Sequence, residues 1–347
     1  MKHFRVALSA GFRRADGRWN FPGFDPEPLA RDPAFEVVQL RNGPLIDASE
    51  LRDIDGLILV GEGLPAAGLA GQARFMAVAR FGVGYDKVDV PACTDAGVAL
   101  TIQPDAVRRP VAVAAITLVL SLAGRLRIKD ALTRQGPAGF AVRTDHMGVG
   151  LEGRTLASLG LGNIGAEMYR LAAPFRMRHI AHDPYARPEV ARDIGVTLVD
   201  IDTLFREADF LCIHCPLTTD TRGLVDAARI AAMKPTAFLV NTARGPIVDQ
   251  RALEDALAQG RIAGAGLDVL DPEPPPAGSR ILGMDNVILA PHALSWTDQC
   301  FAAIGAGCMD TMRSLARGEP PRNVVNDEVL ASSAFADKLA RWKPSGA

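Results

Sequence analysis

Gly160-Leu161-Gly162-Asn163-Ile164-Gly165 is the stretch that decides the fold of this chain. Residues 154–159 before it predict a buried strand, and residues 166–172 after it predict a helix. In such a strand–turn–helix setting, the first glycine permits a tight turn, the second lets the backbone approach a pyrophosphate, and the third lets the helix pack on the strand. The first N–H groups of the helix then face the bound anion. The motif therefore predicts a dinucleotide site in the middle of the chain.

The position of this turn also predicts a two-domain α/β protein. About 150 residues precede it, and a chain of 347 residues can bury two cores. Short apolar stretches alternate with helix-like ones, which is typical of parallel sheets. The expected strands are 6–9, 36–40, 56–60, 75–79 and 98–102, then 155–159, 179–182, 197–198, 210–213, 237–241, 264–268 and 287–290. Long helices are expected at 104–126 and 297–316, an arm or linker at 127–150, and a loose end at 342–347.

The composition argues against a nucleic-acid-binding protein and against a membrane-spanning one. The chain is 48% hydrophobic and 22% charged with a formal charge of −2, so no global basic field recruits nucleic acid or anionic lipid. The longest apolar run, 111–123, is shorter than the roughly 20 residues a membrane span needs. Because no signal peptide is recognisable at the start, a cytoplasmic protein is expected.

The five cysteines are odd in number and irregularly spaced, which argues against a disulfide framework. Cys212 and Cys215 resemble a metal-binding or redox C-x-x-C pair. However, residues three apart on a strand point to opposite faces, and no second Cys/His pair lies nearby. We expect buried thiols and no metal.

Asp183 follows the expected strand 179–182, 18 residues after Gly165. An acidic residue at this spacing can accept hydrogen bonds from the adenosine ribose, and its charge repels a 2′-phosphate. The spacing thus favours NAD over NADP, although the nearby Arg187 keeps NADP open. The alternative interpretation of Asp183 is a solvated turn residue.

Three polar motifs follow the turn, each at the carboxyl end of an expected strand, where ligands bind in open α/β sheets. They contain Arg244 within 241–245, Glu273 within 266–274 and His292 within 290–293. An arginine fork suits a substrate carboxylate. A protonated histidine can donate to a carbonyl oxygen, and an adjacent carboxylate stabilises the imidazolium. Each residue alone is weak evidence, but their order after the glycine turn indicates reduction of a 2-keto acid.

Over residues 75–295 the chain resembles the D-isomer-specific 2-hydroxyacid dehydrogenases, which include phosphoglycerate dehydrogenase, glyoxylate/hydroxypyruvate reductase and D-lactate dehydrogenase. The resemblance rests on several blocks in order. They are 80–86 (RFGVGYD), 153–156 (GRTL) before the glycine turn, 214–218 (HCPLT), 233–235 (MKP), 241–245 (NTARG), Asp268 followed by 273–274 (EP), and 291–292 (PH).

The resemblance implies two Rossmann-like domains, one flavodoxin-like and one NAD-binding, with the nucleotide domain inserted into a discontinuous substrate domain. The substrate domain would comprise 1–103 and 295–347, and the NAD domain 104–294. The catalytic residues would be Arg244, Glu273 and His292, with His292 as acid/base. Substrate contacts would be Val83, Gly84, Arg244 and Trp296. Cofactor contacts would be Gly160, Gly162, Asn163, Ile164, Gly165, Asp183, Cys215, Pro216, Thr221, Thr242, Ala243, Arg244 and Asp268.

The family also implies an oxidoreductase acting on a small 2-keto or 2-hydroxy acid, and a homodimer joined through the arm at 125–150. Glu62, in 60–65 (VGEGLP), would repel a phosphate and argues against 3-phosphoglycerate as substrate. The unusual segment 10–28, with Arg13 and Trp19, could line the substrate side-chain pocket or simply cover the small domain. Two alternative functions remain: an NAD(H)-sensing, corepressor-like binding protein, and a phosphite- or formate-type dehydrogenase.

Overall fold

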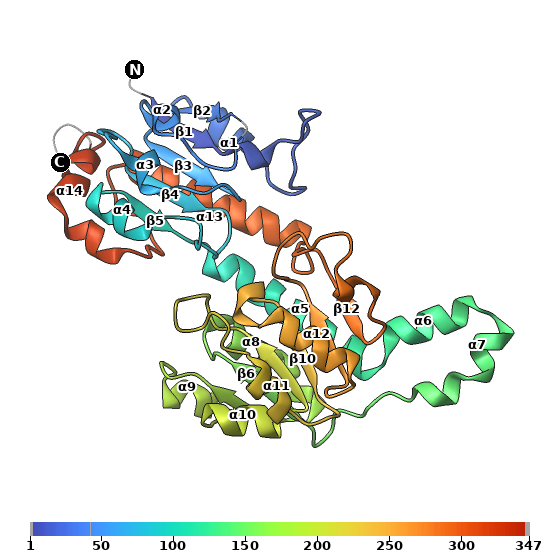
Figure 1. Cartoon of the computed structure of the whole chain (residues 1–347). Helices are drawn as coiled ribbons and strands as arrows, with labels where there is room; N and C mark the ends of the chain where they lie inside the picture. Colours follow the sequence, from blue (N-terminus) through green and yellow to red (C-terminus); the bar gives the residue numbers. More distant parts are fainter. Residues whose placement is uncertain (1–2, 42, 344–347) are drawn as a thin grey trace. The chain divides into compact units, whose positions relative to one another are not determined.

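The chain folds into two compact units, each built on an open parallel sheet (Figure 1). A computed structural model describes residues 3–41 and 43–343. Unit 1 comprises Met1–Val107 and Trp296–Ala347, and unit 2 comprises Arg108–Ser295. Unit 2 is therefore inserted into the sequence of unit 1. The boundaries expected from the sequence fall after residues 103 and 294.

Unit 1 contains a five-stranded sheet in the order β2-β1-β3-β4-β5. This is the order of flavodoxin-like folds. The strands lie where the apolar stretches predict them: β1 Phe4–Leu8, β2 Phe35–Gln39, β3 Gly56–Leu59, β4 Ala77–Arg80 and β5 Ala99–Thr101. Around them lie α1 Glu27–Ala30, α2 Ala48–Leu51, α3 Ala66–Leu69, α4 Val90–Asp95, α13 Asp298–Ala316 and α14 Ser333–Ala340.

Unit 2 contains a seven-stranded sheet in the order β12-β11-β10-β9-β6-β7-β8. Its strands are β6 Thr155–Leu159, β7 Arg178–His182, β8 Thr197–Leu198, β9 Phe210–Ile213, β10 Phe238–Asn241, β11 Gly264–Leu267 and β12 Val287–Leu289. The chain runs outward from β6 to β8 and then crosses back to β9, which pairs with β6. This reversal is the switch point at which doubly wound sheets bind ligands.

Both faces of the unit 2 sheet are covered, which explains why its strands are apolar throughout. On β9, Leu211 and Ile213 join a core with α10 Ile201–Glu207, α11 Ala227–Ala232 and α12 Gln250–Ala258. Phe210 and Cys212 join the opposite core, with α5 Pro104–Ala123, α8 Asn163–Ala172 and α9 Pro188–Asp193. The alternation of side chains along one strand therefore produces two helical layers.

In the described part of the chain, one helix is long and apolar enough to cross a membrane by length and composition alone, namely α5. It is longer than the run 111–123 because it begins at Pro104 and contains Pro110 in its interior. Ala112, Leu118 and Leu122 of this helix are buried in the unit 2 core. Core packing therefore accounts for these three apolar side chains, whereas Val113 and Leu120 of the same helix are exposed.

The segment 127–150, expected as an arm or linker, is an arm that contains helices. This segment forms α6 Leu126–Arg134, α7 Pro137–Ala141 and a 3-10 turn Arg143–His146, which project from the sheet of unit 2 (Figure 1). Helix α5 also ends earlier than expected, at Ala123, and Arg125 takes a left-handed conformation with φ 51°. The polar composition of α6 concealed this helix, because it buries no residue and carries surface pairs such as Asp130–Arg134. Helix α7 is only five residues long.

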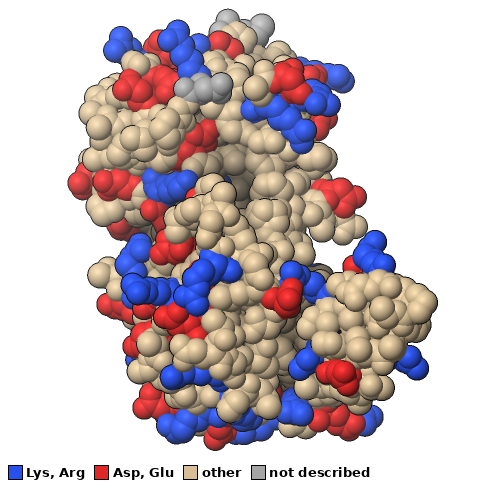
Figure 2. All heavy atoms as spheres, turned by 45° about the vertical axis from the view of Figure 1, so that its right-hand side comes forward, with Lys and Arg blue, Asp and Glu red and all other residues tan. Residues whose placement is uncertain are grey.

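The end of the described chain is also more ordered than expected. Helix α14 was not predicted, and Trp342 packs on Phe4 of β1 with 4.9 Å between ring centroids. Residues 344–347 of the expected loose end lie outside the described residues. Acidic and basic side chains are interspersed over the visible face in Figure 2, in keeping with the formal charge of −2.

Lys338 fixes α14 to unit 1 and gives a pH-dependent prediction. Its ammonium donates to the carbonyl oxygens of Phe75 (2.8 Å) and Ala96 (2.6 Å), and the side chain is 6% exposed. Burial, with a smaller effect from Arg341, lowers the pKa of Lys338 to about 8. The unfolded chain then binds more protons than the folded one between that pKa and the ordinary value, so this residue's contribution to stability rises with pH in that window.

We therefore expect the unfolding free energy of the wild type to rise relative to that of Lys338→Met as pH increases from 8 towards 10. The limiting slope is about 1.4 kcal/mol per pH unit for one proton. Urea unfolding of both proteins at several pH values measures this difference. A difference that stays constant or falls over this range would contradict the prediction.

Candidate active site

The glycine turn of unit 2 is shaped by two close backbone approaches. Gly160 has φ +99°, and a Cβ there would lie 2.6 Å from the backbone nitrogen of Cys215. A Cβ on Gly165 would lie 2.7 Å from the carbonyl oxygen of Gly160. Ser158 donates to the same oxygen at 2.6 Å. Both glycines are thus required by the protein itself, one for the turn and one for packing helix on strand.

Gly162 differs, because nothing in the described protein requires a glycine there. Its φ is −76°, and no atom lies within 4 Å of the position of a Cβ. It is the N-cap of α8, which has no side-chain cap and no acidic residue in its first turn. The N–H groups of Asn163 and Ile164 therefore begin a helix next to open space. This arrangement fits the pyrophosphate of a dinucleotide.

Asp183 belongs to the same turn. One carboxylate oxygen accepts from the Leu161 N–H at 2.7 Å, and the other accepts from the Tyr185 N–H at 2.8 Å. Each oxygen keeps a further lone pair, so a turn role and a ribose contact are compatible. The guanidinium of Arg187 is 76% exposed and lies 4.0 Å from Glu189.

The loop after β9 lies against the glycine turn, because the Cys215 backbone is the group that a Cβ on Gly160 would meet. Thr221 closes this loop: its hydroxyl donates to the Pro216 carbonyl at 2.6 Å and accepts from the Thr218 N–H at 2.7 Å. Burial raises the pKa of the Cys215 thiol to about 11. The thiol is therefore protonated at neutral pH, which does not suit a nucleophile.

The turn after β10 depends on Asn241, a residue that the sequence analysis did not single out. Asn241 is 1% exposed; its side chain accepts from the Ala243 N–H and donates to the Arg244 carbonyl, both at 2.9 Å. The Thr242 hydroxyl is buried, and it has no hydrogen-bond partner among the described residues. Because buried hydroxyls are normally satisfied, this atom fits a ligand contact.

Arg244 follows in extended conformation, and one of its guanidinium nitrogens donates to the Ala243 carbonyl at 2.7 Å. Gly245 comes next and lies so close to the Leu270 carbonyl that no side chain fits. The loop after β10 is therefore held against the loop after β11, which continues to Glu273.

The imidazole of His292 and the carboxylate of Glu273 meet at the end of the sheet. The distance from His292 Nδ1 to Glu273 Oε1 is 2.8 Å, and the two side chains are 44% and 39% exposed. Because Nδ1 is engaged, Nε2 remains for a substrate. His292 has φ +54°, a left-handed conformation that few non-glycine residues adopt.

Asp268 holds the backbone of this histidine turn. It is 3% exposed, accepts from the N–H groups of Ala293 (2.9 Å) and Leu294 (3.1 Å), and its carbonyl accepts from the His292 N–H at 2.7 Å. Burial raises the pKa of Asp268, against the lowering effect of these hydrogen bonds. The family resemblance implies a cofactor contact at Asp268. The structure shows a positioning role that spacing alone did not reveal.

The remaining expected residues belong to unit 1. Val83 and Gly84 follow β4 and Gly82, which has φ +133°. Within the described residues, the N–H groups of Val83 and Gly84 donate to no acceptor. They are thus free to bind an anion. Trp296 opens the second segment of unit 1, and its side chain is 51% exposed.

Comparison with known proteins now decides the family. The family model for the D-isomer specific 2-hydroxyacid dehydrogenase, NAD binding domain, matches residues 116–293. A glyoxylate reductase of Korarchaeum cryptofilum is 36% identical over 282 residues, which cover 81% of this chain and 85% of that protein. The chain belongs to the D-isomer-specific 2-hydroxyacid dehydrogenase family. It is therefore an oxidoreductase with an NAD-binding domain.

Other members of the family show the same relationship. A D-3-phosphoglycerate dehydrogenase of Methanocaldococcus jannaschii is 39% identical over 78% of this chain, but the match spans only 50% of that protein. The structure of D-mandelate dehydrogenase from Rhodotorula graminis aligns with a TM-score of 0.82 and 26% identity, covering 94% of this chain and 98% of that one. The structural alignment supports the two-domain fold of the family.

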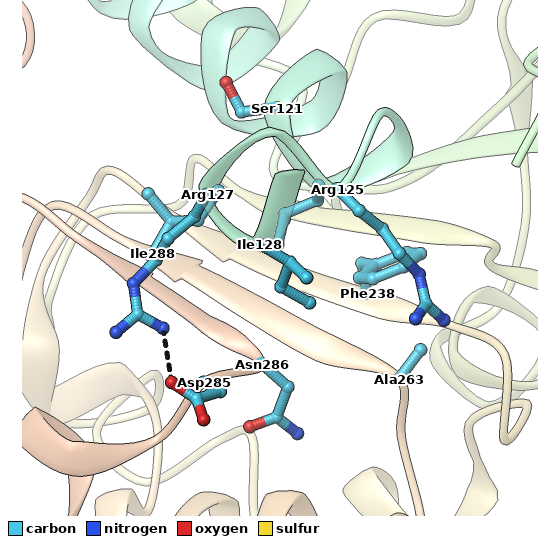
Figure 3. A pocket seen from close by; sticks show the side chains of 10 residues that line it. Ser121, Arg125, Arg127, Ile128, Phe238, Ala263, Asp285, Asn286 and Ile288 are labelled. Atoms are coloured by element: carbon cyan, nitrogen blue, oxygen red, sulfur yellow. Dashed lines mark ion pairs between the residues drawn. The ribbon is translucent and has the colours of Figure 1, made fainter. Parts of the chain in front are cut away.

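A small pocket lies at the amino ends of the unit 2 strands, at the edge of the sheet away from the candidate site (Figure 3). It lies beside the amino ends of β10 and β12, where Arg127 pairs with Asp285 at 3.5 Å. With a volume of about 70 Å³ it is too small for a dinucleotide. Among the residues described, no three His, Cys, Asp or Glu side chains are grouped to hold a metal ion, and all five cysteines are free.

Proposed function

We propose that this protein is an NAD(H)-dependent enzyme that interconverts a small 2-keto acid and its D-2-hydroxy acid. The main observation behind the proposal is the His292–Glu273 pair, with 2.8 Å between Nδ1 and Oε1. This pair and the glycine turn belong to the same unit. A paired imidazole is suited to move a proton at a carbonyl oxygen, and a dinucleotide site beside it is suited to a redox reaction.

His292 is proposed to donate its Nε2 proton to the carbonyl oxygen during reduction and to remove it during oxidation. Glu273 holds Nδ1 and so fixes the ring and its tautomer, while its charge stabilises the imidazolium. Asp268 keeps the histidine backbone in its left-handed conformation by binding the next two N–H groups. These three residues form one proton-transfer unit.

Arg244 is proposed to bind the substrate carboxylate through its guanidinium fork. The N–H groups of Val83 and Gly84, which belong to unit 1, are proposed as further substrate contacts. Unit 1 would then be the substrate domain and unit 2 the nucleotide domain.

The residues that would hold the dinucleotide are those described around the switch point. The pyrophosphate would lie at Gly162 and the start of α8, the ribose at Asp183, and the nicotinamide half at the loops after β9 and β10. The set comprises Gly160, Gly162, Asn163, Ile164, Gly165, Asp183, Cys215, Pro216, Thr221, Thr242, Ala243, Arg244 and Asp268. When bound, the cofactor supplies or accepts the hydride.

We propose NAD rather than NADP because Asp183 places a negative charge beside the ribose position. Asp183→Asn keeps an oxygen that can accept from Leu161 but removes this charge. We expect the ratio of kcat/KM with NADPH to that with NADH to rise about tenfold, the effect of removing one charge repulsion of about 1.4 kcal/mol. Steady-state kinetics with both cofactors measure the ratio. Asp193→Asn, an exposed carboxylate on α9, is the matched control and should leave the ratio unchanged; an unchanged ratio in Asp183→Asn would contradict the assignment.

The substrate is proposed to be a non-phosphorylated 2-keto acid. Two relatives are named for acids without phosphate, glyoxylate and D-mandelate, whereas the relative at 39% identity is named a D-3-phosphoglycerate dehydrogenase, so the proposal rests on Glu62. Glu62 keeps a carboxylate near the loop after β3, where it accepts from the N–H groups of Gly11 (2.5 Å) and Gly61 (3.0 Å). A phosphate would be repelled there.

We further propose that the protein acts in the cytoplasm as a homodimer. The arm leaves large apolar side chains exposed, such as Leu126, Phe140 and Met147. A second copy of the chain would cover them.

The proposal is tested by following NADH absorbance with glyoxylate, hydroxypyruvate, pyruvate and phenylpyruvate. Oxidation of NADH that depends on at least one of these acids is expected. If NADH binds but none of the acids is reduced, the enzyme assignment fails, and weight moves to a nucleotide-sensing binding protein.

A further inference from the structure

The loop after β4 is held through three successive carbonyl groups. The Arg80 carbonyl accepts from the Gly82 N–H at 2.8 Å, and the Gly82 carbonyl accepts from the Gln103 N–H at 2.9 Å. The Phe81 carbonyl, between them, accepts from the guanidinium of Arg80 at 2.9 Å. All of these residues belong to unit 1. The carbonyl groups of residues 80–82 are therefore all occupied within that unit.

The peptide between Gly82 and Val83 sets the direction of the Val83 N–H. In a planar trans peptide, the C=O of one residue and the N–H of the next point in opposite directions. Because the Gly82 carbonyl is bound by Gln103 on one side, the Val83 N–H points to the other. Among the described residues, the N–H groups of Val83 and Gly84 donate to no acceptor. The loop is thus bound from behind and presents two donors in front.

Gly82 is the flexible point of this loop. Its φ is +133°, and glycine rotates more freely than any other residue. The peptide before it is held by the Arg80 side chain, whose Nη1 lies 4.0 Å from the position of a Cβ on Gly82. The peptide after it is held by Gln103, which is 6% exposed and whose side-chain oxygen fills the space that a Cβ on Gly307 would need. Both peptides are therefore fixed by groups outside the glycine itself.

The Arg80 guanidinium also joins the loop to the neighbouring strand. The nitrogen that binds the Phe81 carbonyl donates to the Leu59 carbonyl as well, at 3.1 Å. Leu59 is the last residue of β3 and the register partner of Arg80 on β4. The Arg80 side chain is partly buried. One guanidinium nitrogen therefore ties the peptide before Gly82 to the end of β3.

We infer that Arg80 is a positioning residue for the acidic substrate: it holds the peptide before Gly82, so that the N–H groups of Val83 and Gly84 keep the direction in which they bind an anion. The inference rests on the proposed function, which assigns these two N–H groups to the substrate. Arg80 acts here through the backbone and not by touching the reacting atoms. Its loss should weaken binding of the keto acid and spare both cofactor binding and turnover of the bound substrate.

The experiment measures KM and kcat for the 2-keto acid that the wild type reduces, at saturating NADH, in the wild type, Arg80→Met and Arg80→Lys. Arg80→Met should raise KM about tenfold or more, the effect of weakening one hydrogen bond to a charged group, while kcat and the Kd for NADH stay within about threefold. Lysine keeps the positive charge but not the planar fork on its longer reach. Arg80→Lys should therefore show most of the same rise in KM.

Arg74→Met is the matched control, because Arg74 precedes β4 and so lies at the other end of the same strand. Its guanidinium binds the two carboxylate oxygens of Asp55 at 3.0 Å and 2.6 Å. Asp55 is 1% exposed, so its carboxylate would lose its partner in a buried position. Arg74→Met should therefore lower the thermal midpoint at least as much as Arg80→Met does, yet leave KM unchanged. Stability and positioning are thus measured separately.

Four results would overturn the inference while the proposed function stands. They are an unchanged KM in Arg80→Met, wild-type KM in Arg80→Lys, an equal rise of KM in Arg74→Met, and a rise of KM in Arg80→Met that is matched by an equal loss of NADH affinity. If Arg80→Met does not fold, Arg80→Lys decides by the same comparison of KM. If the wild type reduces no 2-keto acid, the proposed function fails and the inference fails with it.

Discussion

His292→Gln is expected to lower kcat by about 10²- to 10⁴-fold, the usual contribution of a positioned acid/base. Glutamine keeps a hydrogen-bonding group of similar reach but cannot carry the proton. NADH affinity should stay within about threefold of the wild type, because the glycine turn is formed by other residues. Steady-state kinetics and NADH fluorescence titration measure the two quantities. Turnover close to that of the wild type would remove His292 from the proton-transfer role.

The loss of kcat in Glu273→Gln can be compared with the loss in His292→Gln. The Glu273 and His292 side chains are 39% and 44% exposed, so solvent screens their attraction. We therefore expect a smaller loss, about tenfold in kcat, than for His292→Gln. A loss from Glu273→Gln that exceeds the loss from His292→Gln would reverse the assigned roles.

Gly162→Ala is expected to abolish cofactor binding without unfolding the protein. The backbone at this position has φ −76°, and a Cβ would meet no protein atom within 4 Å. The unfolding free energy should therefore change by no more than about 1 kcal/mol, the scale of a changed N-cap. The methyl group would occupy the space proposed for the pyrophosphate, so we expect the Kd for NADH to rise at least about 100-fold, equivalent to about 2.7 kcal/mol.

Gly160→Ala is the contrasting variant. Here φ is +99° and the Cβ would lie 2.6 Å from the Cys215 nitrogen. We expect loss of stability of about 2 kcal/mol or more, together with loss of binding. Titration with NADH and urea unfolding of both variants distinguish the two glycines. Normal NADH affinity in Gly162→Ala would show that the pyrophosphate lies elsewhere.

Most of the sheet architecture could be predicted from the sequence. Strands such as β6 and β9 are buried on both faces, so their sequences are short and apolar. Turn-forming residues mark where they end. The glycine turn could be located because its three glycines follow an apolar run and precede a helix-like one; Gly160 and Gly165 also meet steric needs of the protein itself. The pairing of His292 with Glu273 followed from two motifs at the carboxyl ends of neighbouring strands.

Other features could not be predicted, because they depend on contacts distant in sequence. The arm helix α6 has a polar composition typical of linkers, and α7 is only five residues long. Trp342 packs on Phe4, which lies at the other end of the sequence. The role of Asp268 depends on where the chain returns at residues 293 and 294. The burial of Glu62 depends on the segment at Gly11, about 50 residues earlier in the chain.

The central claim is that His292 and the bound cofactor act on opposite ends of the same carbonyl group to give a D-2-hydroxy acid. The most direct test is chiral chromatography of the 2-hydroxy acid formed with NADH. The substrate is phenylpyruvate or another 2-keto acid with a side chain, because its product is chiral. We predict the D enantiomer from the wild type and almost no product from His292→Gln. The L enantiomer, or equal product from both proteins, would contradict it.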